Sequence, residues 1–208
     1  MLDYELKLHE QGYHLIVGCD EAGRGPLCGP VVCAACILPE NYCNEEINDS
    51  KKLSEKKRKK LFEIIKKEAL YYAIIEISPQ EIDKINIYEA SRKGMTDAIK
   101  KLGVKPDYIL TDAMPLKEFS DIPQEALIKG DAKAINIAAA SILAKVTRDE
   151  IMDELDEKYP QYQFKKHKGY PTKLHLQLIK EYGVIKDIYR FSYNPIKKLS
   201  YEQITLDL

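Results

Sequence analysis

No hydrophobic run in this sequence approaches the roughly 18 residues that a membrane-spanning helix needs. The N-terminal stretch MLDYELKLHEQGY is too polar for a secretory signal peptide. An excess of charge of one sign is also lacking, since 32 Lys and Arg offset 33 Asp and Glu and leave a net charge of -1. We therefore expect a cytoplasmic protein without membrane association, and any basic surface must be local.

Paired cysteine motifs are scarce as well. Five cysteines lie in the first quarter of the chain, and Cys33 and Cys36 form a single C-x-x-C. The odd number, the apolar surroundings and the absence of a second such motif or a nearby histidine pair argue against a zinc or redox centre. We expect reduced thiols buried in the core.

A chain of 208 residues is long enough for one well-packed domain. After a short opening helix, apolar runs predict strands at 14–21, 30–38, 70–78, 107–114 and 126–131. Helical periodicity predicts helices at about 54–69, 86–102, 135–159 and 173–182. Strands first, then strands and helices in alternation, indicate a mixed α/β sheet with helices packed on it.

Four carboxylates each end or follow one of these strands, namely Asp20, Glu21, Asp112 and Asp131. If the strands lie side by side, the four side chains converge. Clustered hard oxygen ligands suit Mg²⁺ or Mn²⁺, which keep waters and bind substrate phosphate oxygens. Two such ions about 4 Å apart would hold an in-line phosphoryl displacement. The alternative is that Asp112 and Asp131 simply begin turns, as Asp often does.

Several basic residues are candidate phosphate contacts. Arg24 lies between Gly23 and Gly25, where the backbone can approach a ligand while the guanidinium reaches a phosphate, although a purely structural turn explains the pattern equally well. Lys129 is a second candidate, with a solvated lysine as the alternative.

Two further segments carry candidate nucleic-acid contacts. Ser50 and Lys51 open a lysine-rich run whose alternative role is the wet face of a helix. Tyr170 follows the basic run KKHK and lies between a glycine and a proline. That setting suits a stacked tyrosine or one that reads the 2′-hydroxyl by which RNA differs from DNA, and an ordinary surface loop is the alternative.

The segments GCDEAGRGPLCGPV, NDSKKLS, TDAMPL, IKGDAKAINIAAASILAKVTRD and HKGYPTKLH occur in this order. Through this combination the chain resembles the ribonuclease HII family, the type 2 ribonucleases H, across nearly its whole length. The resemblance implies a ribonuclease H-like mixed β-sheet flanked by helices, in a single catalytic domain spanning 1–208. It also implies that 160–208 form a small helical extension that binds substrate.

The resemblance implies a metal-dependent endonuclease that hydrolyses the RNA strand of RNA–DNA hybrids. It further implies incision of duplex DNA 5′ of embedded ribonucleotides, leaving 3′-hydroxyl and 5′-phosphate ends. Carried over residue by residue, it assigns metal binding to Asp20, Glu21, Asp112 and Asp131, backbone reading to Gly23, Arg24 and Gly25, and recognition of the ribose to Tyr170.

The expected long helix carries three more residues of the recognisable segments. Ser141 and Lys145 share a helical face, so we expect them to pack near the site, with the Ser141 hydroxyl as a candidate substrate contact. We expect Asp149 to have a structural pairing role rather than to bind metal.

We expect a monomer. The C-terminal SYEQITLDL contains Gln203, Ile204 and Leu206 but lacks the paired aromatics of a sliding-clamp motif, so a clamp partner has little support in the sequence. Two other functions stay open. One is a structure-specific DNA endonuclease with the same acids, against which KGYPT argues, and the other is a non-enzymatic nucleic-acid-binding protein, which the presence of all four acids disfavours.

Overall fold

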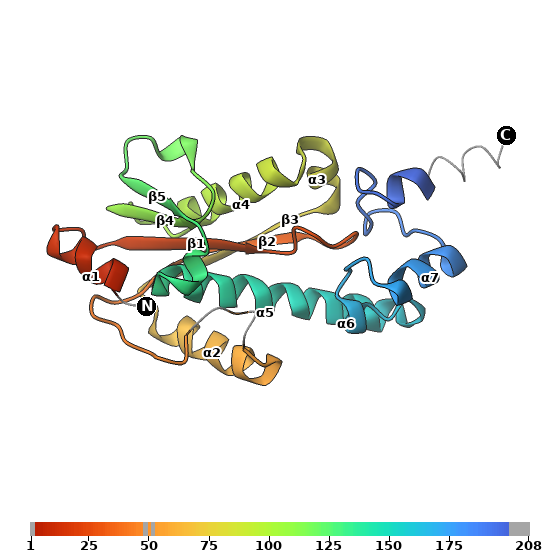
Figure 1. The fold of residues 1–208 in the computed structure, drawn as a ribbon, viewed down its shortest axis with the longest axis horizontal. Coiled ribbons are helices and arrows are strands. Elements are labelled where there is room, and N and C mark those ends of the chain that lie inside the picture. The colour runs from red at the N-terminus through yellow and green to blue at the C-terminus, as the bar shows by residue number, and fades with distance from the viewer. Residues whose placement is uncertain (1–2, 48–49, 51–52, 200–208) are drawn as a thin grey trace.

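The fold is a central five-stranded sheet with helices across both faces, as Figure 1 shows. The computed structural model describes residues 3–47, 50 and 53–199. The strands are β1 (Ile16–Ala22), β2 (Val31–Ile37), β3 (Tyr71–Ile77), β4 (Tyr108–Asp112) and β5 (Gln124–Leu127). Their order is β3-β2-β1-β4-β5, and β1, β2 and β3 pair antiparallel, whereas β4 and β5 run parallel to β1. The expected mixed sheet is confirmed.

Helices α3 and α4 lie across one face of the sheet, while α5 and α2 lie across the other (Figure 1). In chain order the helices and short 3-10 turns are α1 (Asp3–Glu10), α2 (Glu55–Glu68), α3 (Pro79–Ile85), α4 (Ile87–Lys101), η2 (Lys117–Phe119), η3 (Gly130–Ala132), α5 (Ile135–Lys158), η4 (Pro160–Tyr162), α6 (Phe164–His167) and α7 (Lys173–Tyr182). No helix among the described residues has the length and apolar character needed to cross a membrane.

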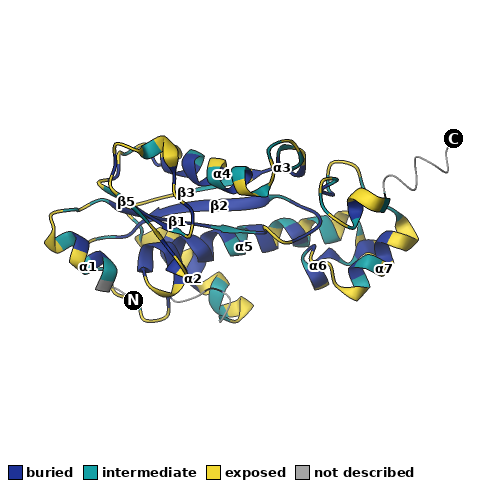
Figure 2. Ribbon diagram, turned by 45° about the horizontal axis from the view of Figure 1, so that its top comes forward, coloured by how far each residue is buried: buried dark blue, intermediate teal, exposed yellow. Residues whose placement is uncertain are grey.

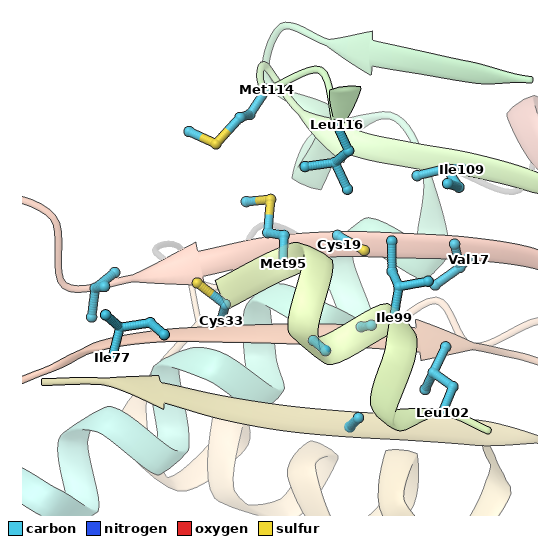
Figure 3. Close-up of a cluster of buried hydrophobic side chains, with 14 of the residues drawn as sticks. Val17, Cys19, Cys33, Ile77, Met95, Ile99, Leu102, Ile109, Met114 and Leu116 are labelled. Carbon is cyan, nitrogen blue, oxygen red and sulfur yellow. The ribbon is translucent and has the colours of Figure 1, made fainter. Parts of the chain in front are cut away.

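Strand β2 is buried on both of its faces, because it lies between two helical layers. Successive side chains of a strand point to opposite faces. Cys33 accordingly joins the cluster beneath α4, drawn in Figure 3, whereas Cys36 joins the cluster beneath α5. The C-x-x-C therefore cannot act as a pair. Four of the five thiols are buried as expected, but Cys43 is exposed, because it lies in the loop after β2.

Helix α5 packs directly on the backbone of β1. A Cβ built on Gly18 would lie 2.1 Å from the carbonyl carbon of Asn136, so only glycine permits this approach. The Asn136 side chain then donates to the Ile16 carbonyl and accepts from the Leu38 N–H. Figure 2 shows the result: the first half of α5 is buried together with the central strands. The helix thus starts buried, and its acidic C-terminal part is more exposed.

Most of the expected elements are present with shifted ends, and the expected strand at 126–131 is the main error. Strand β5 instead ends at Leu127, because Lys129 adopts a left-handed backbone conformation that breaks the strand. Asp131 consequently lies in the 3-10 turn η3 rather than at a strand end. Two short helices, α3 and α6, were not expected from the periodicity of the sequence.

The C-terminal segment packs around the loop between β1 and β2. The Leu27 N–H donates to the Gly169 carbonyl, and the Gly29 N–H donates to the Ile188 carbonyl. Cys28 also forms a β-bridge with Tyr189. Residues that are more than 140 positions apart in sequence thus hold this loop from two sides.

A buried carboxyl from the opening helix caps α5. The N-cap residue Ala134 has no side chain for this task, so Glu5 of α1 accepts from the Asn136 N–H at 3.0 Å. Glu5 is only 1% exposed, and its burial raises its pKa from 4.5 to about 7. Between these two values the folded protein holds a proton that the unfolded chain releases. The contribution of Glu5 to stability must therefore decline as the pH rises from about 4.5 to about 7.

We expect Glu5→Gln to raise the free energy of unfolding more at pH 8 than at pH 5, because the amide keeps the acceptor oxygen but cannot ionise. The effect of the substitution at the two pH values should differ by at most about 3 kcal/mol. Urea unfolding of both proteins at the two pH values measures it, and other titrating groups cancel in the comparison. An effect of the substitution that does not change with pH would show that Glu5 ionises in the fold as it does in water.

Candidate active site

Two of the four acids lie side by side at the ends of neighbouring parallel strands. The register of β1 and β4 pairs Cys19 with Thr111, so the next residues along are Asp20 and Asp112. Asp20 is 4% exposed, and its Oδ1 accepts from the Glu21 N–H. The carboxyl ends of parallel strands meet at one edge of a sheet, which is why two residues so far apart in the chain become neighbours.

Asp131 reaches the same edge by a different route. The turn η3 follows β5, and the Gly130 N–H donates to Asp112 Oδ1 at 2.8 Å. Asp131 comes directly after that N–H and is 4% exposed. The turn therefore places Asp131 next to Asp112, although the strand that was expected to carry Asp131 ends earlier.

The acids repel one another. Burial, followed by the charge of Glu21, holds the pKa of Asp20 well above its usual value, and Asp112 adds to this rise. A hydrogen bond from Ser141 opposes it. Glu21 also forms a 3.5 Å ion pair with Arg24. Carboxylates that are buried against each other in this way are a donor set that fits a divalent cation, since its charge would offset both burial and repulsion.

The four carboxylates do not form a closed cage of protein ligands. Among the described residues, no three of these acids have ligand atoms that all lie within 4.8 Å of one another. The one group of three described side chains that meets this distance lies on another part of the surface. An open arrangement leaves coordination positions for waters and substrate oxygens, as is usual for Mg²⁺.

A cleft of about 210 Å³ opens beside Asp20 and Glu21. Its walls come from the end of β1 and the loop after it, from the segment before α2, from α5 and from the C-terminal segment. The residues are Ala22, Gly23, Arg24, Gly25, Ser50, Ser141, Lys145, Arg148 and Tyr170. Most of the residues expected to contact substrate therefore line one cleft. Lys129 is exposed and lies outside it, next to η3, and Lys51 lies outside the described residues.

Two fully buried arginines hold the loop of Gly23 to Gly25. Arg190 donates to the carbonyls of Gly23 at 2.7 Å, Arg24 at 3.1 Å and Gly29. In a trans peptide the C=O and the following N–H point in opposite directions. The N–H groups of Arg24 and Gly25 therefore point away from Arg190, where they can meet a ligand.

Arg148 of α5 holds the remainder of the same loop. It donates to the carbonyls of Cys28 and Pro30 and, across the cleft, to that of Lys168. Burial lowers its pKa to about 10, which still leaves the guanidinium charged at neutral pH. Neither arginine role was predicted from the sequence, because nothing local marks a residue whose partners are distant main-chain carbonyls.

Tyr170 stands over Gly25, and buried histidines hold its backbone. A Cβ on Gly25 would lie 3.4 Å from the Tyr170 ring, which is 44% exposed. His175 Nδ1 lies 2.9 Å from the Tyr170 carbonyl and must donate to it, so His175 Nε2 accepts from the Tyr189 hydroxyl. Burial lowers the pKa of His175 to about 4, and it is stacked on His167 at 3.9 Å.

Ser50 and Ser141 lie at the floor of the cleft with their hydroxyl oxygens 2.9 Å apart. Beside them, Lys145 donates to Asp149 at 2.6 Å, and Arg58 lies 3.8 Å from the same carboxylate. Asp149 is thus paired with two cations, which agrees with a structural role. Its partners are Lys145 and Arg58.

A mixed sheet with helices on both faces and carboxylates at the ends of β1 and β4 defines a ribonuclease H-like nuclease, a phosphodiester hydrolase. The chain belongs to the ribonuclease HII family, whose model, described as Ribonuclease HII, matches residues 17–196. Ribonuclease HII of Bacillus cereus strain AH820 is 53% identical over 199 residues, which are 96% of this chain and 76% of that protein.

Solved structures agree with this assignment. The ribonuclease H2 from Pyrococcus horikoshii OT3 superposes with a TM-score of 0.77 at 29% identity, over 90% of this chain and 97% of that chain. The RNase HII of Archaeoglobus fulgidus, solved as a complex with PCNA, gives 0.70 at 27% identity, over 85% and 93%. The chain is therefore a ribonuclease H, an endonuclease that acts on RNA–DNA hybrids.

Gly23 and Gly25 provide a matched test of the loop. Gly23 has a φ of +97°, and a Cβ there would lie 2.0 Å from Arg148 Nε, so Gly23→Ala should destabilise the protein by at least about 3 kcal/mol. Gly25→Ala adds a methyl group at ordinary contact distance from Tyr170, so it should cost less than about 1 kcal/mol while lowering turnover. Thermal unfolding and a hybrid-cleavage assay measure the two effects. Equal destabilisation by both would contradict the role given to Arg148.

Proposed function

We propose that this protein is a divalent-metal-dependent endonuclease that hydrolyses the RNA strand of RNA–DNA hybrids and also incises duplex DNA 5′ of embedded ribonucleotides. The products would carry 3′-hydroxyl and 5′-phosphate ends. The observation that carries the proposal is the single cleft in which Asp20 and Glu21 lie beside the backbone of Gly23 to Gly25 and the ring of Tyr170. Acids for the reaction and groups that can sense a ribose thus share one site.

Asp20, Glu21, Asp112 and Asp131 would hold the cations, for which Mg²⁺ and Mn²⁺ both suit the all-oxygen donor set. When bound, such ions activate water and stabilise negative charge on the phosphate. The protein contributes the spacing of the carboxylates. Gly130 orients Asp112 through its N–H, and Ser141 orients Asp20.

The substrate would be read mainly by the backbone and by one aromatic ring. The N–H groups of Arg24 and Gly25 point away from Arg190, which holds the carbonyls of the same two peptides, and the hydroxyl-bearing ring of Tyr170 stands over Gly25. Both are suited to a 2′-hydroxyl, which donates and accepts hydrogen bonds and is absent from DNA. Phosphates flanking the scissile bond would be contacted by Arg24, Ser50, Lys51, Lys129 and Ser141.

Residues 160–208 would act as the substrate-binding extension of a single domain, because they carry Tyr170 and support the loop through Gly169 and Ile188. We propose that the protein acts as a monomer. The Archaeoglobus fulgidus relative was solved with PCNA. A clamp contact by this chain would involve its C-terminal tail, and residues 200–208 lie outside the described structure.

One assay tests the function. Three duplexes of equal sequence, namely an RNA–DNA hybrid, DNA with one ribonucleotide and DNA alone, are incubated with the protein and Mg²⁺ or Mn²⁺. We expect cleavage of the first two and not the third, and loss of cleavage on chelation. Cutting of the DNA duplex would support a DNA endonuclease, and binding without cutting would support a degenerate site.

In the same assay we expect Asp112→Asn to lower turnover by at least about a thousandfold, since one metal-binding charge is lost. The amide oxygen can still accept from the Gly130 N–H, so the thermal midpoint should stay close to that of the wild type. Asp107→Asn is a matched control, because Asp107 also accepts backbone N–H groups but at the opposite end of β4. Wild-type turnover in Asp112→Asn would overturn the metal assignment.

Tyr170→Phe keeps the ring over Gly25 and removes only the hydroxyl. We expect a loss of roughly tenfold on the single-ribonucleotide duplex, the value of one hydrogen bond to the only 2′-hydroxyl present. The loss on a long hybrid should be smaller, because the enzyme can bind and cut it at many positions along the RNA strand. Tyr182→Phe, an exposed tyrosine of α7, is the control. Equal losses on both substrates would argue against reading of the ribose by Tyr170.

A further inference from the structure

At the end of the sheet opposite the active site, a histidine and a glutamate face each other across β1 and β2. The antiparallel register pairs Gly18 with Cys36. Extending this register by four residues, past the start of β1 and the end of β2, places His14 opposite Glu40, and residues opposite each other in this way are within side-chain reach. His14 Nδ1 lies 3.4 Å from Glu40 Oε2. Two ligands of a tetrahedral metal at about 2.1 Å would themselves be about 3.4 Å apart.

A second histidine joins this pair from α1. A ligand atom of His9 lies within 4.8 Å of those of both His14 and Glu40. His9 Nδ1 is 2.7 Å from the Tyr13 carbonyl, which can only accept, so the proton of the neutral ring is on Nδ1 and the lone pair is on Nε2. Metal-binding histidines are commonly oriented in this way by a carbonyl on the other ring nitrogen.

The segment that carries the two histidines is held in place independently of any ion. The Gly12 N–H donates to the His9 carbonyl, and the Tyr13 N–H donates to the Leu8 carbonyl. The N–H groups of His14 and Leu15 both donate to Asp107 Oδ2 at 3.1 and 2.9 Å. Ligands on a braced backbone need little rearrangement to bind, which favours affinity.

We propose that His9, His14 and Glu40 form a second metal site, separate from the carboxylate cluster, for a divalent transition-metal cation of the zinc type. Two imidazoles and one carboxylate suit Zn²⁺ far better than Mg²⁺, which prefers oxygen ligands. The side chains of His14 and Glu40 are 66% and 48% exposed, so the remaining coordination position is open to water.

The ion ties the opening helix to the sheet. His9 belongs to the last turn of α1, whereas His14 precedes β1 and Glu40 follows β2. The same helix provides Glu5, which caps α5. His14 is six residues before Asp20, or about 20 Å along a strand, so the ion would stabilise this end of the fold without contacting substrate. Binding to the folded state alone raises the unfolding midpoint.

The test is calorimetric titration of ZnCl₂ into the metal-stripped full-length protein in excess Mg²⁺, which keeps the carboxylate cluster occupied. We expect one saturable site, a higher thermal midpoint with Zn²⁺, and affinity at least tenfold weaker in His14→Asn and in Glu40→Gln. Glu10→Gln is the matched control, because Glu10 is an exposed acid of α1 next to His9 but outside the cluster. It should bind Zn²⁺ as the wild type does.

Co²⁺ reports the ligand types through its visible absorption. We expect a four-coordinate spectrum without the intense near-ultraviolet band that a thiolate such as Cys43 would add. Hybrid cleavage in excess Mg²⁺ should be unchanged in His14→Asn, so the two metal sites are tested separately. The absence of saturable Zn²⁺ binding, unchanged affinity in both ligand variants, an equal loss in Glu10→Gln, or a thiolate band would each overturn the site and leave His14 and Glu40 as a simple ion pair.

Discussion

The loop beside the candidate active site of this ribonuclease HII family member depends on two buried guanidinium groups. Arg148 from α5 and Arg190 from the C-terminal segment direct their hydrogen bonds to main-chain carbonyls of the loop between β1 and β2. A buried charge is tolerated only when its donors are satisfied, so the carbonyls must stay where the arginines need them. The outward direction of the loop N–H groups follows from this constraint.

Close packing of the sheet holds the acids in place although their mutual repulsion is unfavourable. Asp20 is buried beside other carboxylates, which is unfavourable without a cation. The strand that carries it is held rigidly, because α5 touches the backbone of β1 at Gly18 and Asn136 bridges the start of β1 to the end of β2. A well-packed sheet can therefore hold in position a group whose own environment disfavours its charged state.

Strand β1 links two chemically different ends of the molecule. Its carboxyl end presents the carboxylates of Asp20 and Glu21 to the cleft, and carboxylates offer only oxygen donors. Its beginning follows His14, which lies next to Glu40 and His9. Because the donor atoms differ, the two ends would select different cations. Hard oxygen donors favour Mg²⁺, and imidazoles favour zinc-type ions.

The sequence alone predicted most of the elements and the chemical character of the candidate site. Alternating and continuous apolar runs located the five strands approximately, and acids placed after those runs singled out Asp20 and Asp112, which the parallel register brings together. The long helix was equally clear, because 3.6-residue periodicity is a local property. The ribonuclease HII motifs supplied the family, which the comparisons confirm.

Only the tertiary structure decided how distant groups meet. Asp131 reaches the site through a 3-10 turn instead of a strand, because the left-handed backbone of Lys129 ends β5 early. The partners of Arg190, Asp149 and His175 are also set by the fold, since each contacts groups brought near by chain crossings or by neighbouring turns. Periodicity reports which face of an element is buried. It carries no information on which carbonyl or carboxylate will stand opposite a given side chain, because that depends on how all the elements pack.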